Sequence, residues 1–264
     1  MRRGFYKKGK TTDLDLKGKG WEGNPKSNIV YISDTQFPYH HQDALEFCAA
    51  VARVFQCGSI VSVGDLVDFY WFGDYTKSIE AQSFPQDELA TIAAFDLWGE
   101  VFPKMDVIIG NHENRYNRRL AAAGIPERWL PLQEVLQDKL GMHKGWKLHG
   151  ALRYEDNCCG TIVIHGDEKG ANVTAGSTTN AMGRSVVRGH HHSASFVHTT
   201  HTMAGDLRYD MQLGCLIDDE AVAYNYNKKD LKRPVLNAGV CLGGYKFLIP
   251  MIVDENNRWT GEIL

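Results

Sequence analysis

Five short apolar runs in this sequence end in polar side chains that could bind a metal ion. The residues that follow these runs are Asp34, Asp65, Asn111, His165 and His190. In α/β proteins the loops at the carboxyl ends of the strands converge on one crevice, so we expect these side chains to lie near one another. Burying them costs free energy unless they are paired or bound to a metal. Carboxylate oxygen, amide oxygen and imidazole nitrogen together favour a divalent ion such as Mn, Fe or Zn.

The elements that would position these side chains follow from the apolar periodicity. Short apolar runs bounded by polar residues or glycine predict strands, and apolar residues at helical spacing predict helices. The predicted strands cover residues 29–32, 60–63, 105–109, 147–154, 161–165, 186–187 and 247–253. The predicted helices cover residues 43–55, 86–102, 113–123 and 127–140. Strands that first alternate with helices and then dominate indicate one α/β domain with a mixed sheet system.

Five segments that contain these polar residues also form an ordered set of motifs. They are Asp34-Thr35-Gln36, Gly64-Asp65-Leu66-Val67-Asp68, Gly110-Asn111-His112-Glu113, His165-Gly166-Asp167 and Gly189-His190-His191-His192. The set resembles the motifs of the calcineurin-like metallophosphoesterase superfamily, which are D-x-H, G-D-x-x-D, G-N-H-E/D, an isolated His and G-H-x-H. The resemblance covers about residues 28 to 192.

The resemblance implies a fold and a metal centre. The family fold is a four-layer α/β/β/α sandwich, in which two mixed β-sheets are flanked by helices. By position, the first of two divalent metals would be held by Asp34, Gln36, Asp65 and His192. Asp65 would bridge to the second metal, which would also be held by Asn111, His165 and His190. We expect Mn, with Fe, Zn, Ni or Mg as alternatives, and the two ions would share a hydroxide that attacks a phosphoryl group in line.

The resemblance assigns two further residues to catalysis, and a third residue close by is a candidate for substrate binding. His112 would face the leaving-group oxygen and would be oriented by Asp68. A carboxylate beside an imidazolium raises its pKa and holds it in place, so that it can protonate a departing alkoxide. Arg115 follows shortly after and is predicted to contact the phosphate, with a solvated helix arginine as the alternative.

One position departs from the family pattern. Residue 36 is Gln where the family usually has His, and an amide oxygen is a poorer donor to a borderline metal than imidazole. Gln36 could weaken the first metal site, favour a harder ion such as Mn or Mg, or mark a protein without turnover.

A second departure concerns the class of substrate. Asp68 is followed by Phe69-Tyr70 rather than the Arg-Gly of serine/threonine protein phosphatases, which disfavours protein dephosphorylation.

The substrate is predicted from residues around these motifs. The aromatic segment 69–72 and Tyr75 could stack nucleobases or could pack a loop onto the core. Basic residues that could contact phosphates are Arg115, Arg118, Arg119, Arg184, Arg188 and those of segment 1–27. We therefore expect a phosphodiester in nucleic acid or a nucleotide as the substrate. The alternatives are a phosphomonoesterase for a small metabolite and a non-catalytic binding module.

The remaining histidines are expected to lie outside the metal ligand set. His40 and His41 are expected at the surface. His198 and His201, in a Ser/Thr-rich stretch, are expected either to contact ligands or substrate or to have no role at the site.

Composition limits the class of protein. The chain has 264 residues, 43% hydrophobic and 23% charged, with a formal net charge of −3, which excludes a mainly disordered chain. No stretch approaches the ~20 apolar residues that span a bilayer, so no membrane partner is expected. Residues 1–27 are expected to form a flexible basic arm without the apolar core of a secretory signal, and residues 28–264 a single domain. Six cysteines without a C-x-x-C pair predict reduced thiols and a cytoplasmic protein, and the oligomeric state is not indicated.

Overall fold

The computed structural model describes residues 28–154, 160–168, 171, 173–218, 220–221 and 233–263. The predicted arm at residues 1–27 lies outside the described residues, as do Cys158 and Cys159.

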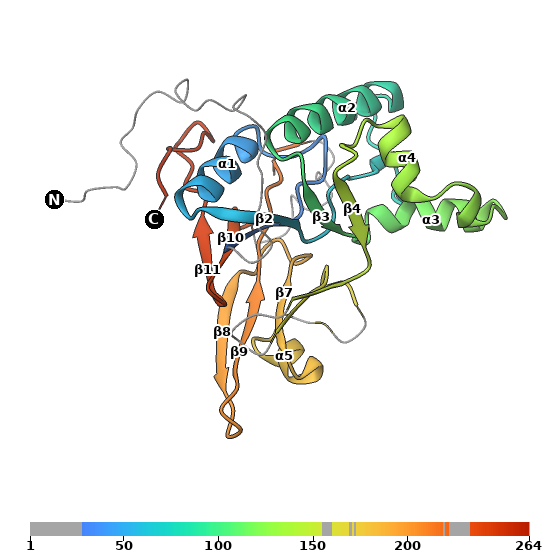
Figure 1. Ribbon diagram of the computed structural model, residues 1–264. Coiled ribbons are helices and arrows are strands. Elements are labelled where there is room, and N and C mark those ends of the chain that lie inside the picture. The colour runs from blue at the N-terminus through green and yellow to red at the C-terminus, as the bar shows by residue number, and fades with distance from the viewer. Residues whose placement is uncertain are drawn as a thin grey trace.

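A six-stranded mixed sheet forms the centre of the fold (Figure 1). Its order is β11-β10-β1-β2-β3-β4. Neighbours are parallel from β1 to β4, whereas β10 is antiparallel to both β1 and β11. The strands are β1 (Asn28–Ile32), β2 (Cys57–Ser62), β3 (Met105–Ile108), β4 (Trp146–His149), β10 (Asn237–Leu242) and β11 (Tyr245–Pro250).

A second mixed sheet of five strands packs against the first. Its order is β5-β6-β7-β9-β8, with β6, β7 and β9 parallel and the two outer strands antiparallel to their neighbours. The strands are β5 (Leu152–Tyr154), β6 (Thr161–Val163), β7 (Ser185–Arg188), β8 (Phe196–His201) and β9 (Leu207–Gln212).

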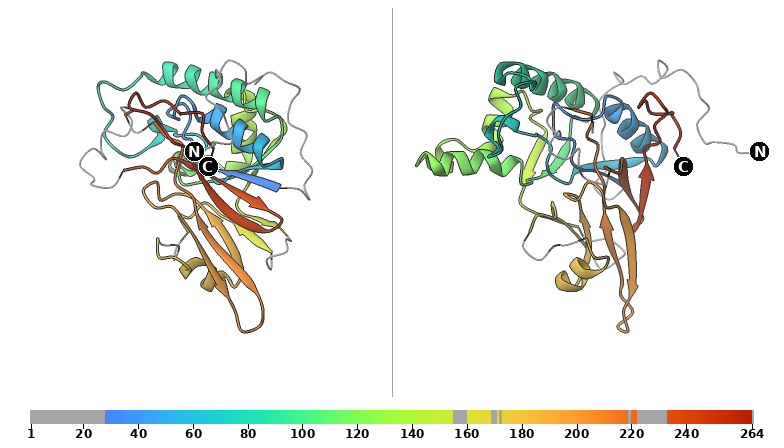
Figure 2. Two further views of the ribbon diagram at one scale, coloured as in Figure 1. Left: turned by 90° about the vertical axis from the view of Figure 1, so that its left-hand side faces the viewer. Right: turned by 180° about the vertical axis from the view of Figure 1, so that it is seen from behind.

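Helices cover the outer faces of both sheets. Figures 1 and 2 show α1 and α2 over the six-stranded sheet and α5 beneath the five-stranded sheet. The helices are α1 (Ala44–Val54), α2 (Phe84–Val101), α3 (Glu113–Ala122), α4 (Leu132–Lys139) and α5 (Ser177–Met182), with short 3₁₀ turns η2 (Tyr70–Phe72) and η3 (Glu127–Trp129). The predicted four-layer α/β/β/α arrangement is confirmed.

The alternation of side chains along β1 explains the layers. Val30 and Ile32 are buried in the cluster beneath the helices, whereas Ile29 and Tyr31 are buried between the two sheets. Successive side chains of a strand point to opposite faces, so an apolar residue at every position is buried on both sides. The central sheet therefore separates two hydrophobic cores.

Two predicted elements are each divided in the structure. The predicted helix 127–140 is a 3₁₀ turn followed by α4, because Pro131 has an extended backbone (φ −61°, ψ 134°) and begins a new helix. The predicted strand 147–154 is divided between β4 and β5, which belong to different sheets on either side of Gly150. Among the described residues, no helix is both long and apolar enough to cross a membrane.

Candidate metal centre

The predicted ligands come together where the ends of strands from both sheets meet. Asp34 and Asp65 follow β1 and β2 of the six-stranded sheet, and His165 and His190 follow β6 and β7 of the other sheet. The backbone N–H of His190 donates to Asp34 Oδ2 at 3.0 Å, which links the two sheets directly at this edge. This convergence matches the expectation that the loops at the strand ends share one crevice.

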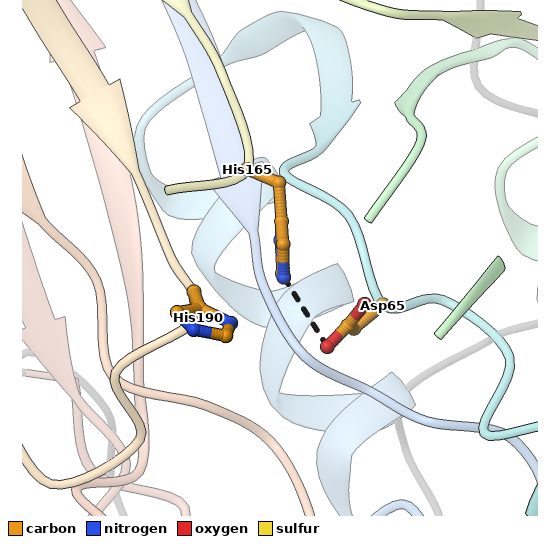
Figure 3. Close-up of side chains that lie close together, drawn as sticks. All are labelled: Asp65, His165 and His190. Carbon is orange, nitrogen blue, oxygen red and sulfur yellow. Dashed lines mark ion pairs between the residues drawn. The ribbon is translucent and has the colours of Figure 1, made fainter. Parts of the chain in front are cut away.

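One group of potential ligands consists of Asp65, His165 and His190. Figure 3 shows these three side chains converging from separate segments, and their potential ligand atoms all lie within 4.8 Å of one another. His165 Nε2 is 3.2 Å from Asp65 Oδ2 and 3.1 Å from Asn111 Oδ1. Asp65 and His165 are fully buried. All four residues predicted for the second metal therefore surround one point.

The other group consists of Asp34, Asp65 and His192, again with ligand atoms within 4.8 Å of one another. His192 Nε2 is 3.0 Å from Asp34 Oδ1 and 3.2 Å from Gln36 Nε2. A 180° turn of the amide would exchange Nε2 and Oε1 of Gln36, and the amide is assigned by its hydrogen bonds. Gln36 thus lies beside His192, and its role as a ligand stays a prediction. Asp65 belongs to both groups, as a bridging ligand must.

The electrostatics of these groups fit divalent cations. Burial raises the pKa of Asp34, but His192 and His165 outweigh burial and lower it. Burial also raises the pKa of Asp65, but His112 and His165 hold it well below its usual range. Burial lowers the pKa of His165, and the two carboxylates more than reverse this. The two buried carboxylates therefore favour positive charge beside them. Divalent ions would supply this charge, and the histidines would then bind the ions as neutral imidazoles.

The backbone at the predicted ligands is strained. The φ angles of Asp34, Gln36, Asp65 and His190 are 50°, 49°, 49° and 71°. Non-glycine residues rarely adopt positive φ, and each such residue costs about 1–3 kcal/mol unless the surrounding structure holds it. Residues of this kind cluster at functional sites. Four of the seven predicted ligands are in this conformation, which supports a site selected for chemistry rather than stability.

The glycines of the motifs bring the loops close together. A Cβ added to Gly110 would lie 2.2 Å from Asp65 Oδ1, and one added to Gly189 would lie 1.8 Å from Ser33 Oγ and 2.7 Å from Asp34 Oδ2. All three distances are shorter than the contacts that real Cβ atoms make. These positions require glycine because the backbone itself packs against the ligand carboxylates.

Glu113 supports the site, although no role is predicted for it from its residue type and position alone. It is fully buried, and its carboxylate accepts the backbone N–H groups of Asp65 at 3.1 Å, Val67 at 2.9 Å and Gly110 at 2.7 Å. These bonds tie the loop after β2 to the loop after β3. The signal that could have identified it is its place in Gly110-Asn111-His112-Glu113, as an acidic residue at the start of a helix.

His112 lies against Asp68, as the resemblance implies, and also against Arg115. His112 Nδ1 is 3.0 Å from the Asp68 carbonyl oxygen and 3.3 Å from Asp68 Oδ2. Burial lowers the pKa of His112, but Asp65 and Asp68 outweigh burial and the opposing Arg115, and the pKa is raised. Arg115 donates to the Asp68 carbonyl oxygen at 2.8 Å, and its second terminal nitrogen is 2.9 Å from His112 Nε2. The guanidinium therefore lies beside the imidazole.

The structure corrects part of the basis for a nucleic-acid substrate. Arg188, expected to be available for phosphates, is fully buried and donates from Nε to Asp210 at 3.0 Å. It lies on a strand covered by α5 and the neighbouring strand β9. Phe69 is also buried, with its ring 6.3 Å from that of Tyr116, so it packs its loop onto α3 rather than presenting a face to a base. Tyr75 is 71% exposed.

The structure also corrects the placement of two histidines. His41 is buried and the ring of His40 is 4.8 Å from Phe37, rather than both lying at the surface. Burial lowers the pKa of His40 to about 4. This placement depends on a contact that is distant in the sequence, since His40 bridges to Ile217. His198 and His201 are exposed on β8, and among the described interactions neither contacts a predicted ligand.

Comparisons with known proteins give structural similarities alone. No protein-family model matches the chain, and no curated protein matches it. An archaeal phosphodiesterase is similar with 13% identity and a TM-score of 0.44, over 84% of this chain and 99% of that chain. Vps29 of Chaetomium thermophilum is similar with 9% identity and a TM-score of 0.45, over 90% and 93%. YfcE, a phosphoesterase from E. coli, is similar with 10% identity and a TM-score of 0.43, over 90% and 96%. At these values the function of this chain has to be inferred from its own residues.

Proposed function

We propose that this protein is a dinuclear metal-dependent phosphoesterase. The observation that carries the proposal is the sharing of Asp65 between two groups of potential ligands, Asp34 and His192 on one side and His165 and His190 on the other. Asn111 and Gln36 complete the two ligand sets. When bound, two divalent ions would neutralise the phosphoryl oxygens and activate a water for attack.

The chain's own residues would then handle the proton of the leaving group. A water that has released one proton to solvent would attack phosphorus, the bond from phosphorus to the leaving oxygen would break, and His112 would give that oxygen a proton from Nε2. Asp68 holds the ring through Nδ1. A proton on Nε2 would face the Arg115 guanidinium 2.9 Å away, and two donors repel. Arg115 therefore turns towards the substrate phosphate when His112 is protonated.

We favour a phosphodiester in nucleic acid or a nucleotide as the substrate. Lys77 and Arg119 lie around the same turn as Arg115, where both donate to the Gly73 carbonyl oxygen at 3.0 and 2.9 Å. Burial, Arg115 and Arg119 lower the pKa of Lys77, although Asp68 and Asp74 oppose this, so three cations and two carboxylates share this turn. Among the described residues, no carboxylate lies within 4 Å of the Lys77 ammonium. A cationic group of this kind suits a substrate with further phosphates next to the one cleaved.

A second candidate, a non-catalytic binding module, is favoured by Gln36. An amide is a weaker ligand than imidazole for a borderline metal such as Zn, and a weak first site would leave the shared carboxylate without its second ion. A Gln36→His variant should bind Zn more tightly at that site in calorimetry. Unchanged affinity would mean that residue 36 is not a ligand.

The test of the proposal is hydrolysis of bis-(p-nitrophenyl) phosphate with added Mn. We expect turnover that falls by at least about a hundredfold in Asp65→Asn and in His112→Gln. His198→Ala, which changes an exposed histidine on β8, is the matched control and should retain full activity. Turnover unchanged in Asp65→Asn would refute the proposal. Monoester turnover far above diester turnover would refute the substrate class, and a protein inert with every metal would support the binding module.

A further inference from the structure

A cavity of about 200 Å³ lies between η2, α2, α3 and α4, and four aromatic side chains line it. They are Phe69, Phe72, Phe84 and Tyr116. The ring of Phe72 is 5.2 Å from Phe69, 6.2 Å from Phe84 and 6.2 Å from Tyr116, each edge to face. The cavity exceeds the ~150 Å³ that is enough to hold benzene. An aromatic wall of this kind therefore surrounds space for a small organic group.

A single buried carboxylate, Asp87, lies in the wall of this cavity. Asp87 is 7% exposed and accepts a hydrogen bond from Tyr39 Oη. Among the described residues, no lysine, arginine or histidine lies within 4 Å of its carboxylate. Burial and the nearby Asp68 raise the pKa of Asp87 to about 6, although Tyr39 opposes this, so the group is largely ionised at neutral pH. A buried carboxylate without a cation is costly unless a ligand supplies the charge.

This cavity is separate from the metal centre. Val67 and Phe69 line it, while Asp68 between them points to His112 and Arg115. The left-handed backbone of Phe69 (φ 51°, ψ 43°) turns the chain directly after Asp68. A molecule in the cavity would therefore lie behind the loop that carries Asp68, out of reach of the ligands that surround Asp65.

We propose that this cavity binds an organic ammonium ion, such as a methylated ammonium group. Aromatic rings attract a cation through the negative potential of their faces, and a carboxylate supplies the counter-charge. At the rim, Glu88 is half-buried and Lys139 is exposed, so the carboxylates outnumber the cations that line the cavity. The ammonium nitrogen would lie between Asp87 and the rings of Phe72 and Phe84, with its methyl groups in apolar contact.

The experiment compares choline with 3,3-dimethylbutan-1-ol, which replaces the charged nitrogen by carbon and keeps the shape. Binding to the full chain is followed by calorimetry at a pH above the pKa of Asp87. We expect choline to bind at least about tenfold more tightly than the neutral alcohol. Asp87→Asn should remove that preference. Phe84→Leu, at a position 45% exposed, should weaken choline binding with little risk to folding.

Leu97→Ala is the matched control, because Leu97 is 55% exposed on the same helix and does not line the cavity. Its affinity for choline should equal that of the unchanged protein. The inference is overturned if choline and the alcohol bind equally, if neither binds at millimolar concentration, or if both Asp87→Asn and Phe84→Leu bind choline as before. Phosphoesterase activity is not part of the readout, so failure here would leave the proposed function intact.

Discussion

Replacing Glu113 by Gln tests how the protein holds the loop that carries Asp65. Oε2 of Glu113 accepts the N–H groups of Asp65 and Gly110, and Oε1 accepts that of Val67. An amide keeps one oxygen, so the best orientation preserves two bonds and turns an NH₂ group towards the N–H of Val67. One buried donor then loses its partner, which costs about 1–3 kcal/mol. The free energy of unfolding should fall by that amount in urea denaturation without metal.

The same substitution should weaken metal binding. Residues that orient a ligand typically change metal affinity by about 10–100-fold when they are altered. We therefore expect Mn affinity, measured by calorimetry, to fall within that range in Glu113→Gln. Glu134→Gln, at an exposed position of α4, is the matched control and should change neither quantity. Unchanged Mn affinity in Glu113→Gln, with a stable fold, would refute the idea that this carboxylate positions Asp65.

Three further predictions concern the site and its surroundings. Gly189→Ala should abolish Mn binding in calorimetry, because the Cβ of the new alanine would overlap the loop after β1. Gly150→Ala is the control and should bind Mn normally, because no atom lies within 4 Å of the added Cβ. Arg188→Met should lower the free energy of unfolding by about 3–5 kcal/mol, because it leaves Asp210 buried without its cation. Adding Asp210→Asn should restore part of this loss in the same urea assay. If nothing is restored, the pairing of Arg188 with Asp210 is contradicted. The pKa of Asp87 is raised from 3.8 to about 6 in the folded protein, so the folded form binds its proton more tightly and stability falls as pH rises through that window. Relative to Asp87→Asn, the unchanged protein should lose up to about 3 kcal/mol of unfolding free energy between pH of about 4 and about 6, and parallel stability curves would refute this.

The strands that precede the polar residues could be predicted because local signals determine them, whereas β8, β9 and β10 were not predicted. The apolar run before Asp34 is buried on both faces, and such a run ends where a polar residue follows. Because β1, β2 and β3 are parallel neighbours, the residues that follow them lie at the same edge of the sheet. His165 and His190 follow strands of the other sheet, so their approach to Asp65 to within 4.8 Å also depends on how the two sheets pack.

Other features depend on contacts that are distant in the sequence. His40 becomes half-buried because its segment pairs with Ile217, and Arg188 becomes buried because Asp210 lies beside it on β9. Neither partner lies near enough in sequence to be recognised from local pattern. Pro131 carried a local signal, but a helical apolar pattern that continues on both sides of it concealed the break in the predicted helix.

The role of Glu113 illustrates a different limit. Its acidic side chain at a helix start has an ordinary explanation, since carboxylates are favourable near helix N-termini. Only the three backbone N–H groups around it show that it joins two loops. A side chain that acts by accepting bonds from the backbone leaves no pattern of partner residues in the sequence.

The central claim is that Asp65 joins two metal sites, and a Mn titration followed by electron paramagnetic resonance tests it most directly. The structure predicts two ions per chain whose spectrum shows magnetic coupling, because they share one carboxylate. Asp65→Asn should remove the coupling and lower the number of ions bound. A single uncoupled ion in the unchanged protein, or coupling that persists in Asp65→Asn, would contradict the claim.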